Sequence, residues 1–151
     1  MKKMAIVVVL LGMVAVVLGG VFIGMGVAKN NQLVEAMQVE QVALPLGEDD
    51  VEPSAIDSAE EAQAAGDLIR EHRRGIAPSY QELLGEGRFD PTNPEHLTYA
   101  QAMNMENYLY LAVIGFGLIQ ATIASGVFMV ITGLALGSTG VVLYRFNQKL
   151  S

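Results

Sequence analysis

A block of 38 residues without a charged side chain, from Asn107 to Tyr144, constrains the fold of this chain more than any other feature. As one helix the block would be about 57 Å long. A single crossing of a hydrocarbon core about 30 Å thick would then need a tilt of about 58°, beyond the usual range of roughly 0–40°. The block therefore either folds back as a hairpin of two short crossings or extends out of the membrane after one crossing.

The residues at the centre of the block favour the hairpin. Ser125 and Gly126 lie at its midpoint and are suited to a turn at the membrane surface. The hairpin would also bring Tyr108 and Tyr144 to one interfacial belt, where tyrosines concentrate. The alternative is one long helix that crosses once. It leaves residues 107–119 outside the membrane, apolar on every face and in need of a partner that covers them.

A second apolar segment, from Ala5 to Ala28, runs for 24 residues between Lys3 and Lys29. It is about 36 Å long as a helix, enough to cross a bilayer with some tilt. A cleaved signal peptide is the competing interpretation, since the segment ends in small residues. The apolar core of a signal peptide usually runs for only about 7–15 residues, so we expect an uncleaved N-terminal anchor.

Glycines recur at intervals of seven in both apolar segments. They are Gly12, Gly19 and Gly26 in the first segment and Gly126, Gly133 and Gly140 in the second. This interval keeps small side chains on one face of a left-handed helix pair, where two backbones can approach closely. We expect these faces to pack on each other or on copies of themselves. Chance spacing is the alternative, because glycine is common in membrane helices.

The region between the apolar segments is strongly acidic. All sixteen acidic residues lie within it, and with its five basic residues the stretch 29–106 carries a net charge of −11. Nucleic acid and anionic lipid headgroups would repel such a region. The expected partners are membrane lipid around the apolar helices and either a second copy or another membrane subunit. The chain has no cysteine, which excludes disulfides and thiolate metal sites.

The basic residues at the two ends bear on orientation. Lys2 and Lys3 precede the first apolar segment, which predicts a cytoplasmic N-terminus in the plasma membrane and a central region outside the cytoplasm. Arg145 and Lys149 obey the same rule if the C-terminal block crosses once. They conflict with it if the block is a hairpin.

The central region is predicted to form short helices joined by turns. Capping-box patterns begin helices at Ser58 and Ser79, and Asn93 followed by Pro94 begins a third. Gly75 is expected to end the first helix in the left-handed conformation, and Gly85 and Gly87 are expected to stop the second. The first apolar helix should continue from Asn30 to Ala43, and residues 47–53 read as an acidic linker without the ligand spacing of a calcium loop.

These observations predict an all-α membrane protein in four parts. Residues 1–28 form the N-terminal transmembrane anchor, and residues 29–106 form an acidic extramembrane region of short helices. Residues 107–145 form the C-terminal helical hairpin, or one long helix that crosses once. Residues 146–151 form a polar tail.

Chemistry-bearing patterns are few. Glu71-His72 and Glu95-His96 lack the spacing and the third ligand of a metal site, so surface or capping roles are expected. Arg70, Arg73 and Arg74 are expected to compensate a helix dipole and to pair with Glu71 or Asp67, with binding of a phosphate or an acidic partner as the alternative. Neither apolar block holds an ionisable residue, which argues against a proton relay. No nucleophile motif, phosphate loop or haem ligand set appears, so no enzyme, catalytic residue or cofactor is predicted.

The sequence therefore predicts a non-enzymatic structural, assembly or accessory subunit that acts through glycine-faced helix packing. The first alternative is an oligomeric pore or transport component. Its lining would be Gln120, Thr122, Ser125, Thr132, Ser138 and Thr139. In either case Gln120 is a candidate for a hydrogen bond between helices. The second alternative is a metal-binding extramembrane module built on the two Glu-His pairs.

Overall fold

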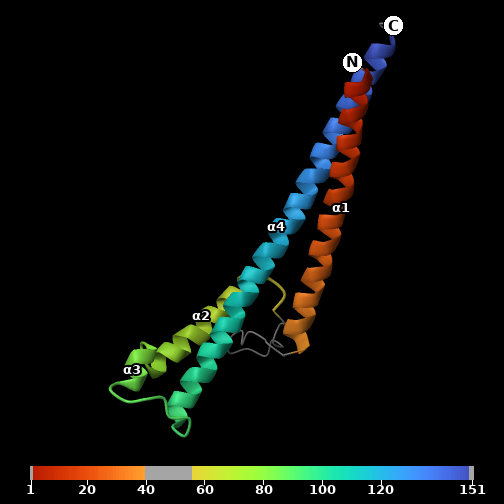
Figure 1. The fold of residues 1–151 in the computed structure, drawn as a ribbon. Helices are drawn as coiled ribbons and strands as arrows, with labels where there is room; N and C mark the ends of the chain where they lie inside the picture. The colour runs from red at the N-terminus through yellow and green to blue at the C-terminus, as the bar shows by residue number, and fades with distance from the viewer. Residues whose placement is uncertain (1, 40–55, 150–151) are drawn as a thin grey trace. The chain divides into compact units, whose positions relative to one another are not determined.

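The computed structural model describes residues 2–39 and 56–149, and every regular element in that part is a helix (Figure 1). The elements are α1 (Lys2–Val39), α2 (Ala59–Ile76), α3 (Tyr80–Leu84) and α4 (Pro94–Lys149). The predicted all-helical class is confirmed. Helices α1 and α4 are both long and apolar enough to cross a membrane. The predicted acidic linker, residues 47–53, lies outside the described residues.

Helix α4 runs for 56 residues without interruption, so the predicted hairpin is wrong and the C-terminal block lies in one long helix. At the expected turn, the Ser125 hydroxyl donates a hydrogen bond of 2.7 Å to the carbonyl of Ala121, four residues back in the helix. Gly126 has no side chain, and its backbone lies close to the backbone of Gly19 in α1. A continuous helix also satisfies every backbone group along an apolar stretch, which a turn there would not.

The chain divides into two compact units, and α1 and α4 contribute to both. The paired-helix unit comprises α1 as far as Asn31 and α4 from Leu118 onward. The helical module comprises residues 32–117. The boundaries expected after residues 28 and 106 thus fall inside α1 and α4.

In the paired-helix unit the two helices run antiparallel and bury only a narrow strip. The buried residues of α1 there are Ala5, Gly12, Gly19 and Gly26, each seven apart. Only 11% of the most apolar stretch of α1 is buried, and only 17% of that of α4. Core helices of a soluble protein would be mostly buried, so this pair leaves an apolar surface of unusual extent uncovered.

Helix α2 begins and ends for local reasons. The Ser58 side chain accepts a hydrogen bond from the Glu61 amide, and the Glu61 carboxylate accepts one from the Asp57 amide, which confirms the predicted cap. The predicted left-handed stop at Gly75 is wrong, because α2 continues to Ile76 and Ala77 is extended. The residue before a proline is pushed to extended conformations, so Pro78 sets this end.

The next two helix starts follow the sequence prediction. Ser79 caps α3 by accepting from the Glu82 amide at 3.2 Å, and Gly85 ends α3 with a φ of 56°. The left-handed φ is the conformation that glycine adopts without strain. Asn93 accepts from the Glu95 amide at 2.9 Å and so caps α4, with Pro94 as the first helical residue.

The core of the helical module explains how α4 tolerates its apolar length. Leu109, Ala112 and Phe116 of α4 are buried in one cluster with residues from the α2 side and from the end of α1. The other buried members are Ile56, Ala62 and Ala65, and the flanking residues include Leu33, Val34, Met37 and Ile69. Small residues on α2 allow the close approach, and Gly66 lies against Leu109 and Tyr110. The same chain therefore covers one face of residues 107–117, the face that carries Leu109, Ala112 and Phe116.

Candidate functional site

Reciprocal glycine pairs bring the backbones of α1 and α4 close together in the paired-helix unit. A Cβ added to Gly12 would lie 2.6 Å from the carbonyl oxygen of Gly133, and one added to Gly133 would lie 2.6 Å from that of Gly12. Gly19 and Gly126 repeat the arrangement at 2.6 and 2.7 Å. At each of these four positions only a hydrogen fits between the two backbones.

The close approach of the two backbones allows weak polar contacts between the helices. Each glycine directs a Cα hydrogen at the other's carbonyl oxygen, the arrangement of a weak Cα–H···O contact worth about 0.5–1 kcal/mol. Between apolar helices in lipid the hydrophobic effect contributes little. Close packing and such polar contacts therefore decide association. The contact depends on both helices carrying glycine at matching levels.

The same strip extends to both ends with other residues. Gly140 lies against Val9, where an added Cβ would be 2.7 Å from a methyl carbon, and close to the carbonyl of Ala5. At the other end Gly26 has no glycine opposite it, and the Ile123 side chain occupies the space instead. The six glycines of the seven-residue repeats therefore all lie on the helix contact. We call this strip the glycine seam.

Two pairs of glycines four residues apart, Gly20 with Gly24 and Gly133 with Gly137, match the GxxxG motif of membrane helices, but their spacing does not follow the glycine seam. A Cβ added to Gly20, Gly24 or Gly137 would meet nothing within 4 Å. Gly137 approaches α1 through its backbone, since a Cβ on Gly12 would lie 2.7 Å from the Gly137 nitrogen. The interval of seven, rather than the interval of four, follows the contact along this pair.

The polar side chains of α4 in the paired-helix unit bond mainly to their own helix. The hydroxyls of Thr122, Ser125, Ser138 and Thr139 each donate to a carbonyl four residues earlier, at 2.7–2.8 Å. Gln120 is exposed and forms no hydrogen bond to the described residues. The hydroxyls of Thr122, Ser125, Ser138 and Thr139 therefore need no water-filled lumen to satisfy them.

The helical module holds a buried polar cluster that sequence reasoning missed. Glu106 of α4 accepts a hydrogen bond of 2.7 Å from the Arg73 Nε, and both side chains are about nine-tenths buried, at 12% and 10% exposure. The Tyr99 hydroxyl accepts a second bond from Arg73, whose guanidinium also lies 4.9 Å from the centre of the Tyr99 ring. The contact with Glu106 raises the pKa of Arg73 above its ordinary value.

A second, more exposed cluster joins the same two helices. The Tyr110 hydroxyl donates a hydrogen bond of 2.7 Å to Asp67, and Arg70 forms an ion pair of 2.7 Å with the same carboxylate. The hydrogen bond from Tyr110 is the main reason that the pKa of Asp67 lies below its ordinary value, with a smaller contribution from Gln63. Two of the three arginines thus bind α2 to itself and to α4.

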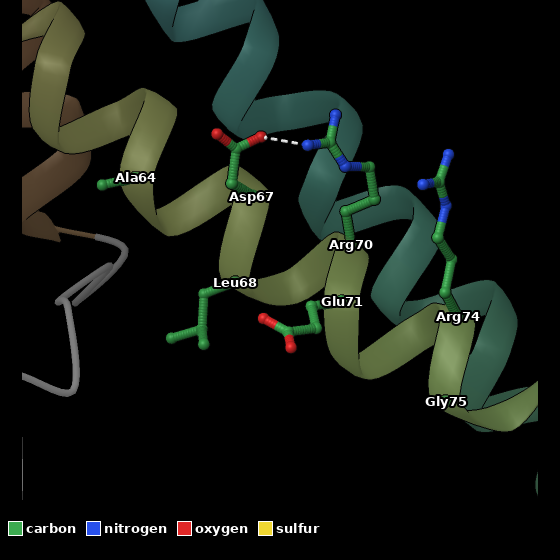
Figure 2. Close-up of a pocket in the computed structure, with 7 residues that line it drawn as sticks. All are labelled: Ala64, Asp67, Leu68, Arg70, Glu71, Arg74 and Gly75. Atoms are coloured by element: carbon green, nitrogen blue, oxygen red, sulfur yellow. Dashed lines mark ion pairs between the residues drawn. The ribbon is translucent and has the colours of Figure 1, made fainter.

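Figure 2 shows a shallow hollow along one side of α2. Its lining residues are Ala64, Asp67, Leu68, Arg70, Glu71, Arg74 and Gly75. Leu68 and Glu71 point away from the Asp67–Arg70 pair, and Arg74 extends along the helix beside Arg70. One helix supplies every lining residue, with charges of both signs, so the hollow offers no enclosed site for a ligand.

The two Glu-His pairs lie in different surroundings. Glu71 and His72 are exposed on α2, whereas His96 accepts a hydrogen bond of 3.0 Å from the Asp90 amide and stacks on Phe89 at the start of α4. Among the described residues no group of three or more metal-ligating side chains lies together. His96 therefore has a structural role at the entry to α4.

One signal for the missed cluster was present in the sequence. Glu106 is the only charged residue between His96 and Arg145, so a long apolar helix face carries a single carboxylate. A lone carboxylate there requires a cationic partner, and the arginine triplet on α2 was the only basic group of that size in the central region.

No protein-family model, curated protein or solved structure matches this chain.

Proposed function

We propose that this chain is a small integral membrane protein that crosses the bilayer twice and serves as a structural, assembly or accessory subunit. The reciprocal contacts along the glycine seam carry the proposal. They occupy the close-packing faces of both apolar helices within one chain. The pair is then a self-sufficient anchor, and the acidic helical module is the part left to meet other molecules.

The distribution of basic residues supports an orientation for this anchor. Because α1 and α4 run antiparallel, Lys2 and Lys3 lie at the same end of the pair as Arg145 and Lys149. Basic residues concentrate on the cytoplasmic side of membrane helices. Both ends of the chain are then cytoplasmic and the helical module lies outside the cytoplasm, with the plasma membrane as the proposed location.

The two alternative functions lack a supporting observation in the described residues. The six candidate pore positions are spread over about 200° of the α4 circumference at 100° per residue, so they do not form one polar face. Four of the five hydroxyls among them, those of Thr122, Ser125, Ser138 and Thr139, bond within α4. For a metal-binding module, no sufficient group of ligands lies together in the part of the chain that the structure describes.

The test uses the absence of cysteine from the chain. Glu86→Cys places a thiol at an exposed site of the helical module, and Gln148→Cys places one near the end of α4. We expect a membrane-impermeant maleimide to label Glu86→Cys in intact cells, and Gln148→Cys only after permeabilisation. Labelling of both thiols from the same side would overturn the two-crossing topology. The reverse pattern would overturn the orientation alone.

A further inference from the structure

The exposed side of α4 in the helical module carries a regular row of uncharged residues. The row consists of Leu97, Gln101, Asn104, Tyr108 and Leu111, and we call it the outer face of α4. Its members alternate four and three residues apart, the spacing of a coiled-coil seam. Tyr108 and Leu111 are 65% and 62% exposed, so the row ends in a large uncovered apolar surface.

The outer face differs from the rest of the module in charge. Residues 29–106 carry a net charge of −11, yet α4 holds only one charged residue between His96 and Arg145. That residue, Glu106, is buried against Arg73 on the opposite side of the helix. Two copies of so acidic a region repel each other across most of their surfaces. The outer face is a place where they can meet without opposing like charges.

The residues of the row also suit contact with their own copies. In a parallel helix pair about a twofold axis, each residue meets the same residue of the partner. The amides of Gln101 and Asn104 both donate and accept hydrogen bonds, and so does the Tyr108 hydroxyl. None of these three side chains forms a hydrogen bond to the described residues, whereas Tyr99 and Tyr110 on the other side of α4 do.

We propose that the outer face of α4 binds the outer face of a second copy of this chain, in a parallel pair. The proposal rests on the proposed function, because two chains inserted with the same orientation present this face in parallel. A lipid surface suits the row less well. Lipid would remove water from the amides of Gln101 and Asn104 without replacing their hydrogen bonds.

The test places single cysteines in the full-length, otherwise cysteine-free chain and oxidises native membranes under mild conditions. Asn104→Cys and Leu111→Cys lie on the row, and Thr98→Cys is an exposed control on another side of the same helix. We expect at least about fivefold more disulfide-linked dimer for the two row positions than for the control, as a specific interface favours one register. Equal amounts at all three positions, or no dimer at the row, would overturn the proposal.

A second variant separates a specific interface from random collision. Leu111→Glu in the Asn104→Cys background places two carboxylates opposite each other, so the dimer yield should fall by about fivefold or more. Thr98→Glu in the same background is the matched control and should leave the yield unchanged. Raising the salt concentration from about 0.05 M to 0.5 M should increase the yield of the parent variant, because screening weakens the repulsion between acidic surfaces. A salt-induced decrease would contradict it.

Carbonate extraction of the same membranes distinguishes a failure of the helix pairing from a failure of the proposed function. A chain that stays in the membrane but gives no dimer at Asn104→Cys overturns only the pairing. A chain that carbonate releases from the membrane overturns the proposed function itself.

Discussion

Arg73 and Glu106 join α2 to α4 through an ion pair of 2.7 Å in which both side chains are almost removed from solvent. The two residues are 33 positions apart in the chain. A buried ion pair costs much desolvation free energy and repays it only with good geometry and further hydrogen bonds. Tyr99, itself only 1% exposed, supplies one of those bonds and covers the guanidinium with its ring.

The pair predicts an asymmetry between single and double substitutions. Glu106→Gln leaves the Arg73 guanidinium buried without its counter-charge, and the free energy of unfolding of the helical module should fall by about 3 kcal/mol. Replacing both residues, as Arg73→Leu with Glu106→Leu, should recover most of the loss, because no uncompensated charge remains. Urea unfolding followed by circular dichroism in detergent micelles measures both. A double variant as unstable as the single one would contradict this account.

The glycine seam predicts that neighbouring glycines differ sharply in tolerance. Gly19→Leu forces side-chain atoms against the backbone of α4, and the helix pair should lose about 3 kcal/mol, the upper end for overpacked sites. Gly20→Leu is the matched control, because its Cβ enters open space and the expected change is within about 0.5 kcal/mol. The midpoint of thermal unfolding in detergent compares them. Similar midpoints for the two variants would show that the seam does not stabilise the pair.

The Tyr110–Asp67 hydrogen bond predicts a dependence on pH. Its donation lowers the pKa of Asp67 below the ordinary value of 3.8, so the ionised carboxylate stabilises the module above that value. This contribution is lost as the pH falls below about 4 and through the lowered pKa. Tyr110→Phe should raise the pKa of Asp67 toward 3.8, as read from the carboxyl carbon shift in an NMR titration. Tyr108→Phe is the control and should leave that pKa unchanged.

The cap of α2 predicts a smaller, local effect. Ser58→Ala removes the acceptor of the Glu61 amide, which should cost about 1 kcal/mol of module stability. Ser58→Asp keeps an acceptor there and places a negative charge at the positive end of the helix dipole, so it should restore the parent stability. Hydrogen exchange of the Glu61 amide reports on this site directly. Equal exchange in both variants would mean that the cap contributes nothing.

Local signals in the sequence predicted where the helices begin. Contacts between residues far apart in the chain could not be predicted from those signals. Ser58, Ser79 and Asn93 cap their helices as expected because a cap depends on residues within one turn. The hairpin prediction failed because Ser125 and Gly126, interpreted as a turn, lie inside the continuous helix α4. Part of that block is covered by α2, whose Ala62 and Ala65 are small enough to admit Leu109 and Phe116. That contact joins residues far apart in the chain, and spacing within one segment does not reveal it.

The Arg73–Glu106 pair escaped prediction for a related reason. The sequence pattern places Arg73 and Arg74 in the last turn of their own helix, where a basic residue compensates the dipole. Arg73 instead points across to α4, and the sequence feature that marks this is the isolation of Glu106 in an apolar stretch. The isolation of Glu106 in an apolar stretch therefore indicates the ion pair better than the position of Arg73 in its own helix does.

The pairing of Gly12 with Gly133 has a consequence for biosynthesis, because 121 residues separate the two glycines in the chain. At the usual synthesis rate of about 5–20 residues per second, α1 waits roughly 6–24 s before the matching part of α4 exists. During that interval its glycine strip is open to the membrane and accepts any close-fitting helix. A newly made chain therefore passes through a stage in which its first helix is competent to bind the wrong neighbour, and the arrival of α4 ends that stage.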